Sequence, residues 1–498
     1  PGRDPSGAPE ATDESNDMEA TEPESTPPSD NETTTAEVQF PADYSTAAPV
    51  PADIIAANFD TGVVFDVDGT QVILIRDTRQ PLVGMTLIMP GYGSDAVPAD
   101  KVGLASLAAD LLTRGSAGRS AAEQNELLDA AGISLSASDG GDHTRVTGSF
   151  PKGSMADAVM FANELLTQPN LDEREFANLR ARAAAGLQQS LSDPSGVASR
   201  ELDTLLFGDT PAGRNPDPRI VASLTLEDAV EHVKRAYGRE GQTLILAGDL
   251  DEAEATEFAS KLLDGVKLSS SKTIDPIAYE LSAYRPQILL VDNPGGGQSA
   301  VRLGNRAFKI DSDEKYAASV ATQVLAGGIE SRLNQAMRAE KGLTYGAGGR
   351  FNPGRHVGEF FVGFATRPET TGEAITTAFG VLTRMASESV SEEELVDAQR
   401  RVAGSLVLSQ QTVGQLANLR GNILLNGYPL SYFNDYGQKI AGVDVQDVQN
   451  VIASYATPDL LSIVVVAPAD AVKTQLDQIG DVTVVPMPLA RQPEAMTP

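Results

Sequence analysis

The chain has 498 residues, 41% of them hydrophobic, which is long enough for two or three domains rather than one core. Its formal net charge of −31 argues against a nucleic-acid-binding protein, because such a protein needs a basic face to neutralise phosphates. The absence of cysteine excludes disulfides and thiol chemistry. No apolar run approaches the roughly 20 residues that a membrane-spanning helix needs.

Residues 1–48 are rich in Pro, Ser, Thr, Glu and Asp, and Arg3 is their only basic residue. Such a composition cannot offset the entropy of ordering by burial, so we predict a disordered acidic tether. The sequence starts at Pro1 rather than Met, which fits either removal of a signal peptide or a trimmed chain. From the first alternative we expect a bacterial periplasmic or cell-envelope protein, processed from a signal-bearing precursor.

The rest of the chain contains an internal repeat. The apolar segment Val72–Ile75 before Asp77 resembles Ile288–Val291 before Asp292. Further matched pairs are residues 103–112 with 315–325, 171–175 with 390–394, 205–208 with 424–427, and 244–246 with 463–465. Ser391 and Glu394 fit a capping box at the start of one of these helices. We therefore predict a first unit over residues 49–267, a linker over 268–285 and a second unit over 286–498.

Each unit reads as strands, a helix, two more strands, about three helices and a closing strand. Residues 133–137 and 144–150, for example, alternate apolar and polar side chains as half-buried strands do. This order predicts an α+β fold with two tandem homologous units. In each unit we expect a mainly antiparallel sheet with helices on one face.

Three segments are distinctive: Gly327–Leu333 (GGIESRL), Arg338–Tyr345 (RAEKGLTY) and Leu244–Leu250 (LILAGDL). With the repeat, they make the sequence resemble the pitrilysin and mitochondrial processing peptidase family of insulinase-like zinc metallopeptidases, from about residue 55 to 485. The resemblance implies that the units are α/β rolls. It also implies where a zinc site belongs.

That family carries an inverted H-x-x-E-H motif on the first helix of a unit. Its two histidines and a more distant Glu bind zinc, and its central Glu activates water. In this chain, Ser106 stands at the position of the first His, Ala109 at that of the general base and Asp110 at that of the second His. The distant ligand position falls on or beside Leu187 and Gln188.

The corresponding helix of the second unit, within residues 316–324, contains no His either. We therefore expect no metal and no other cofactor in this chain. His143, His232 and His356 share no motif spacing, which favours structural histidines over zinc ligands. Gly295–Gly297 lacks the spacing and the Lys of a phosphate loop, so we predict a turn between strands, with a substrate-touching loop as the alternative.

Arg338 and Tyr345 remain as candidate catalytic residues. We predict that Arg338 lies on a helix that Gly342 ends, and that Tyr345 begins the next strand, which would aim both side chains at one point. An Arg near a helix C-terminus and a half-buried Tyr also have purely structural roles. The resemblance implies that such a pair binds a substrate carbonyl and stabilises its oxyanion. We expect Arg332 to be structural, bracing the helix.

These expectations combine into one functional hypothesis. The chain would be the non-metal-binding subunit of a heteromeric zinc peptidase that acts on unfolded peptides in an enclosed chamber. A homologous partner with an intact H-x-x-E-H motif would supply zinc and the general base, and Arg338 and Tyr345 would act in trans. The alternative is a catalytically inert scaffold or a peptide-binding subunit of a larger complex.

Overall fold

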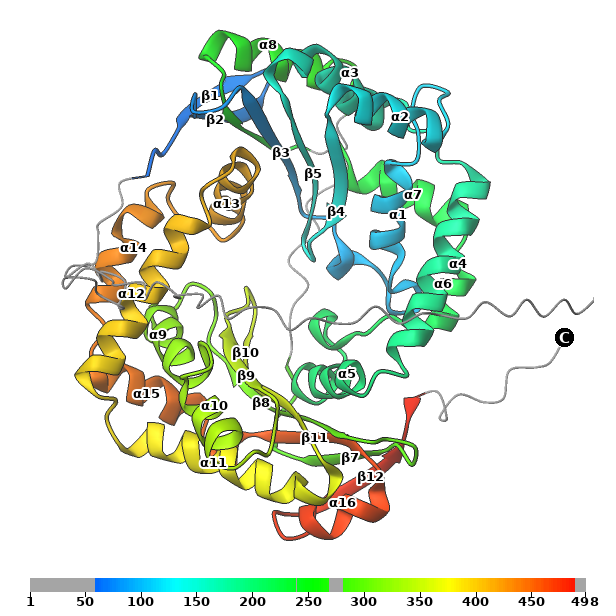
Figure 1. The fold of residues 1–498 in the computed structure, drawn as a ribbon. Helices are drawn as coiled ribbons and strands as arrows, with labels where there is room; N and C mark the ends of the chain where they lie inside the picture. The colour runs from blue at the N-terminus through cyan, green and yellow to red at the C-terminus, as the bar shows by residue number, and fades with distance from the viewer. Residues whose placement is uncertain (1–58, 239, 268–280, 489–498) are drawn as a thin grey trace, which may run out of the picture. The chain divides into compact units, whose positions relative to one another are not determined.

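The computed structural model describes residues 59–238, 240–267 and 281–488 (Figure 1). The predicted tether and most of the predicted linker lie outside the described residues. No helix in the described ranges has both the length and the apolar character that crossing a membrane requires.

The first unit is built on a six-stranded mixed sheet in the order β1-β2-β6-β3-β5-β4. Its strands are β1 (Val63–Val67), β2 (Thr70–Arg76), β3 (Leu82–Pro90), β4 (Ser134–Asp139), β5 (His143–Pro151) and β6 (Thr243–Gly248). Only the β2–β6 pair is parallel. The sheet is mainly antiparallel, as predicted.

The second unit repeats this sheet in the order β12-β7-β11-β8-β10-β9. Its strands are β7 (Ile288–Asp292), β8 (Ser299–Ala307), β9 (Ala347–Asn352), β10 (Gly358–Thr366), β11 (Ser462–Ala467) and β12 (Val482–Pro486). The edge strands β1 and β12 break the repeat. β1 pairs antiparallel with β2, whereas β12 comes from the C-terminal end of its unit and pairs parallel with β7.

Helices fill the segments between the strands (Figure 1). The first unit contains α1 (Leu104–Leu112), α2 (Ala121–Ala131), α3 (Met155–Thr167), α4 (Glu173–Ser190), α5 (Pro194–Phe207), α6 (Pro218–Ser223), α7 (Leu226–Ala236) and α8 (Glu252–Leu263). The second contains α9 (Glu314–Ala326), α10 (Arg332–Asn334), the π-helix η5 (Gln335–Glu340), α11 (Thr371–Ser387), α12 (Glu392–Leu408), α13 (Val413–Leu425), α14 (Tyr432–Ala441), α15 (Val445–Tyr455) and α16 (Ala469–Leu476). Single 3₁₀ turns occur at residues 94–96, 99–101, 152–154, 211–213, 368–370 and 458–460.

One face of each sheet forms the core of its own unit. In β10, Phe360, Val362 and Phe364 are buried on that face and alternate with less buried residues, as the period of a strand requires. In the first unit, the ring of Phe150 stacks on Phe258 of α8, with ring centroids 5.7 Å apart. The predicted α+β architecture with two homologous units is confirmed.

The opposite face of each sheet is covered by a helix from the other unit. α13 packs on β3 and β6 of the first sheet, and α5 packs on β8 and β11 of the second (Figure 1). Gly84 of β3 permits this approach, because a Cβ there would lie 2.7 Å from the backbone of Val413. The repeat predicted helices on one face only and gave no signal of this exchange.

Candidate functional site

Arg338 lies in the π-helix η5, which continues directly from α10. Gly342 ends this segment with φ +60°, a left-handed conformation that favours glycine. Its N–H donates to the Arg338 carbonyl at 3.2 Å, and the Leu343 N–H donates to the Met337 carbonyl at 2.8 Å. The predicted helical position of Arg338 and the glycine cap are both present, although the helix is of the rarer π type that often occurs at functional sites.

Tyr345 lies two residues before β9, which begins at Ala347, so the prediction that it starts the strand was wrong. The residue is 89% exposed. The guanidinium carbon of Arg338 lies 5.0 Å from the centroid of the Tyr345 ring, within the range of a cation–π contact. The two residues, seven positions apart, are thus in direct contact on the surface.

A buried asparagine ties together the segments that carry this pair. The Asn334 amide nitrogen donates to the carbonyls of Gly328 and Ala347, both at 3.0 Å, and to Ser331 Oγ at 3.2 Å. Its side-chain oxygen accepts the Ala347 N–H at 2.9 Å. One side chain therefore fixes the start of β9 against α10 and against the glycine turn before it. Sequence reasoning missed Asn334.

The loop between Arg338 and Tyr345 is also fixed by contacts with the core of the second unit. Met337 and Leu343 are buried in the core of the second unit. The Thr366 hydroxyl donates to the Leu343 carbonyl at 2.7 Å, and the Thr344 hydroxyl bonds across the turn to the Gly346 backbone. An exposed Arg and an exposed Tyr thus rest on a fixed base, which is how a binding site keeps its geometry before its ligand arrives.

Arg332 has the bracing role that the sequence suggested. Its guanidinium donates twice to the carboxylate of Glu394, with both distances 2.8 Å. Glu394 also completes the predicted capping box with Ser391 at the start of α12. The hydrogen bonds from Arg332 lower the pKa of Glu394 to about 2. The pair links α10 to α12 just ahead of the Arg338 segment.

The altered zinc motif lies on α1, which packs against α4. Ser106, Ala109 and Asp110 fall at i, i+3 and i+4, so they share one face of the helix. Ser106 and Asp110 are exposed and Ala109 is buried. Neighbouring protein atoms displace part of the water around the Asp110 carboxylate and raise its pKa, and the positive charges of Arg114 and Arg182 oppose that rise.

These residues do not fit a zinc ion. Ala109 offers no donor atom, and two arginines near Asp110 would repel a cation placed beside it. At the distant ligand position on α4, Leu187 is half-buried against the apolar core and Gln188 is exposed. Within the described ranges, no group of three or more His, Cys, Asp or Glu side chains could hold a metal ion.

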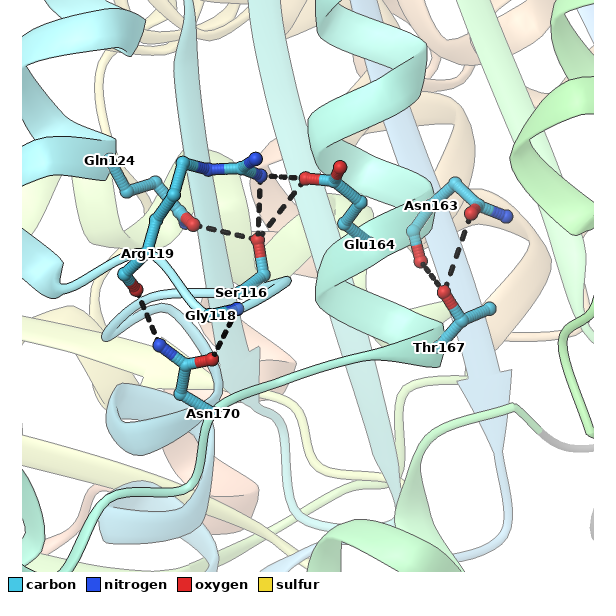
Figure 2. A network of polar contacts seen from close by, with 8 residues as sticks. All are labelled: Ser116, Gly118, Arg119, Gln124, Asn163, Glu164, Thr167 and Asn170. Carbon is cyan, nitrogen blue, oxygen red and sulfur yellow. Dashed lines mark hydrogen bonds and ion pairs between the residues drawn. The ribbon is translucent and has the colours of Figure 1, made fainter.

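A buried polar network fixes the loop that follows α1 (Figure 2). Ser116 Oγ donates to Gln124 of α2 at 2.7 Å, and Arg119 pairs with Glu164 of α3. The amide of Asn170 bonds back to this loop from the far end of α3. These bonds tie the loop after α1 to α2, to α3 and to the segment that follows α3.

The three histidines belong to no group of side chains that could hold a metal ion within the described ranges. His143, the first residue of β5, has Nδ1 at 3.0 Å from Asp142 and Nε2 at 2.7 Å from Arg145. His232 is buried on α7 with its ring 5.1 Å from that of Tyr92, and this burial lowers its pKa to about 4. His356 lies half-buried between β9 and β10. These surroundings favour structural roles. Gly295–Gly297 lies in the turn between β7 and β8, as predicted.

Comparison with known protein families identifies the family to which this chain belongs. Residues 71–215 match the family described as insulinase (peptidase family M16), and residues 223–402 match the peptidase M16 inactive domain. The two matches together cover about two thirds of the chain. The chain belongs to the M16 peptidase family. The resemblance seen in the sequence is thereby confirmed.

The non-peptidase homologue YmxG of Helicobacter pylori is 24% identical over 401 residues, which are 80% of this chain and 91% of that protein. The crystal structure of a peptidase M16 inactive domain from Pseudomonas fluorescens superposes with a TM-score of 0.74 at 22% identity, covering 82% of this chain and 98% of that one. The periplasmic protease PqqL of Escherichia coli gives a TM-score of 0.70 at 17% identity, over 86% of this chain and 49% of that one. The relatives thus include a protein named a non-peptidase homologue and a protease, and the motif positions on α1 of this chain lack the His and Glu residues of H-x-x-E-H.

Proposed function

We propose that this chain is the non-metal-binding subunit of a heteromeric M16 peptidase and contributes Arg338 and Tyr345 to the partner's zinc site. The observation that carries the proposal is the 89% exposure of Tyr345, in cation–π contact with Arg338, above a fully packed base. An exposed arginine and tyrosine that are held in place by a packed base can present their donor groups to a bound molecule. A substrate at a facing active site would be such a molecule.

The two side chains suit one chemical task. The Arg338 guanidinium is a permanently charged donor, and the Tyr345 hydroxyl is a neutral donor. Together they would hold a peptide carbonyl oxygen and stabilise the negative charge that develops on it during attack by water. Removal of one such donor costs about 2.7–4 kcal/mol of transition-state stabilisation. Zinc in the partner would supply the activated water.

The partner would be a homologous M16 chain with an intact H-x-x-E-H motif, and the substrates unfolded peptides within a chamber between the subunits. The PqqL alignment supports a two-chain arrangement, because this chain corresponds to only 49% of that polypeptide. A second subunit would provide what PqqL carries in one chain. PqqL is described as periplasmic, and we propose the periplasm or cell envelope for this chain too, which fractionation of the source cells would test.

The second candidate is an inert scaffold or a peptide-binding subunit. The likeness to YmxG favours it, because that protein is named a non-peptidase homologue. Under this alternative, Arg338 and Tyr345 do not affect catalysis by any partner. A peptide-binding role further predicts that the isolated chain binds unfolded peptides, which a scaffold does not.

The test is peptide hydrolysis by the chain alone, by a homologue that carries H-x-x-E-H, and by their mixture. We expect activity in the mixture only. Arg338→Ala and Tyr345→Phe should each reduce kcat/KM by about 100-fold or more while leaving the complex intact on size exclusion. Arg384→Ala, which removes an exposed arginine on α11, serves as the matched control. A stable complex whose activity is unchanged by both variants would establish the scaffold instead.

A further inference from the structure

A second candidate site lies in the second unit, among α9, α12, α13 and α14. It is a cavity of about 380 Å³, near the lower end of the range for ligand pockets. Its walls are mainly apolar and aromatic, with Leu406, Ile423 and Tyr432 among them. Neither Arg338 nor Tyr345 lines it. We refer to it as the Tyr–Lys pocket.

Lys315 is the cation of the Tyr–Lys pocket. Its ammonium lies 4.4 Å from the ring centroid of Tyr428 and 5.4 Å from that of Tyr432. It donates to the Tyr428 hydroxyl at 3.0 Å and to the Ile310 carbonyl at 3.3 Å. No carboxylate among the described residues comes within ion-pair distance of it. An ammonium has three protons, so one remains for a ligand.

The aromatic wall is ordered and stays uncharged. The rings of Tyr428 and Tyr432 stack with centroids 4.2 Å apart and planes 7° from parallel. The Tyr428 hydroxyl donates to the Ile310 carbonyl, which leaves its oxygen to accept from Lys315. Burial raises the pKa of both hydroxyls, so neither adds negative charge at neutral pH. The wall offers flat apolar surface beside a positive charge.

The charges around the pocket limit what it can accept. The chain carries a net charge of −31, yet no carboxylate among the described residues lines this cavity. Asn422 of α13 and Asn426, which follows the last residue of that helix, also line the cavity with their amide groups, and the Asn422 side-chain oxygen accepts from Arg145 at 3.3 Å. Asp311 and Asp313 lie outside the lining but close enough to raise the pKa of Tyr428. Lys315 attracts a negatively charged group of a ligand, and the two aspartates limit how much negative charge the site accepts.

We propose that the Tyr–Lys pocket binds an apolar or aromatic group that ends in a single carboxylate. Either the C-terminal residue of a peptide or a free aromatic carboxylic acid has this chemistry. The carboxylate would bond to Lys315 and the neighbouring amides, and the apolar body would lie against Tyr432, Leu406 and Ile423. A cavity of this size holds the end of a chain but not a long segment. The proposal does not depend on the function of Arg338 and Tyr345.

Calorimetric titration of the full chain tests this with three probes: a tetrapeptide that ends in Phe with a free carboxylate, the same peptide as its amide, and 3-phenylpropionate. We expect the carboxylate peptide to bind and the amide to bind at least about tenfold more weakly. Lys315→Gln should abolish the difference between the two, and Lys315→Arg should retain it. Lys439→Gln is the matched control, because Lys439 lies on α14 over the Tyr316 ring and does not line this pocket.

Each outcome of these titrations supports or overturns the proposed ligand site. Binding of phenylpropionate alone supports the site with free acids as its ligands, and binding of the carboxylate peptide alone supports peptide ends. Equal binding of peptide acid and amide, no binding of any probe, or an unchanged affinity in Lys315→Gln would overturn the proposal. Thermal melts of the variants confirm folding. Because no partner is needed, a negative result here leaves the trans-acting role of Arg338 and Tyr345 untouched.

Discussion

Replacing Arg332 with Met should lower the free energy of unfolding by about 1–2 kcal/mol at pH 7. The pKa of Glu394 falls from its ordinary 4.5 to about 2, mainly through the two hydrogen bonds from Arg332. At about 1.4 kcal/mol for each unit, the ceiling is roughly 3.4 kcal/mol. The Glu394 side chain is 37% exposed, so solvent screening reduces this by about half. Met retains the apolar stem of Arg332 and removes only the charge and its donors.

The stability difference between the parent and Arg332→Met should depend on pH with a definite sign. A carboxylate with a lowered pKa in the folded state stabilises the protein above its unfolded-state pKa, and this contribution is lost as the pH falls toward the folded-state value. The difference between the parent and Arg332→Met should therefore be constant from pH 7 to about pH 5. It should then shrink as the pH falls from 4.5 toward 2.

Urea unfolding followed by circular dichroism at pH 7, 5 and 3.5 measures this difference. Arg384→Met, in which an exposed arginine is replaced, is the control and should change stability by less than about 0.5 kcal/mol. A double-mutant cycle with Glu394→Gln separates the pair from the cap that Glu394 forms on α12. A difference that persists unchanged to pH 3.5, or a coupling energy near zero, would refute the reasoning.

Three further predictions concern single sites. Asn334→Ala should cost about 2–4 kcal/mol, because it leaves backbone groups at the start of β9 unpaired; a loss no larger than that of exposed Asn450→Ala would contradict this. Burial lowers the pKa of His232 to about 4, so protonation in the unfolded state below pH 6.5 should reduce the free energy of unfolding, by about 2 kcal/mol at pH 5. Urea titrations of His232→Leu should lack this loss of stability in acid. Gly84→Ala should lower the melting temperature by several degrees because its Cβ meets the backbone of α13, whereas Gly153→Ala has open space; equal melting points would disprove the clash.

Much of the fold was predictable because it depends on local and repeated signals. Alternation in β4 and β5 and the capping box at Ser391 follow from spacing within a few residues, and the matched strands β2 and β7 follow from the long-range repeat. The exchange of α5 and α13 was not predictable, because the apolar face of a helix does not indicate which sheet the helix covers. The edge strands β1 and β12 were not predicted either, because neither has a counterpart among the matched segments of the two units.

The candidate site was likewise predictable only in part. Arg338, Gly342 and Tyr345 were identified from adjacent sequence, and the structure places Arg338 against Tyr345 as the spacing suggested. Asn334 was missed because its bonds join backbone groups 13 residues away, and no local pattern marks a polar side chain for burial. The Tyr–Lys pocket assembles residues more than 100 positions apart, such as Lys315 and Tyr428, so only the fold reveals it.

The exchange of α5 and α13 also bears on how such a protein can be cut and recombined. A fragment of residues 286–498 would lack α5 and leave Leu289, Val464 and Val466 open to water, so it should aggregate unless the other fragment is present. A chimera that joins halves of two homologues would seat each exchanged helix on a foreign sheet. α5 therefore has to match the strands of the second unit and α13 those of the first, so we expect the two halves to fold only together.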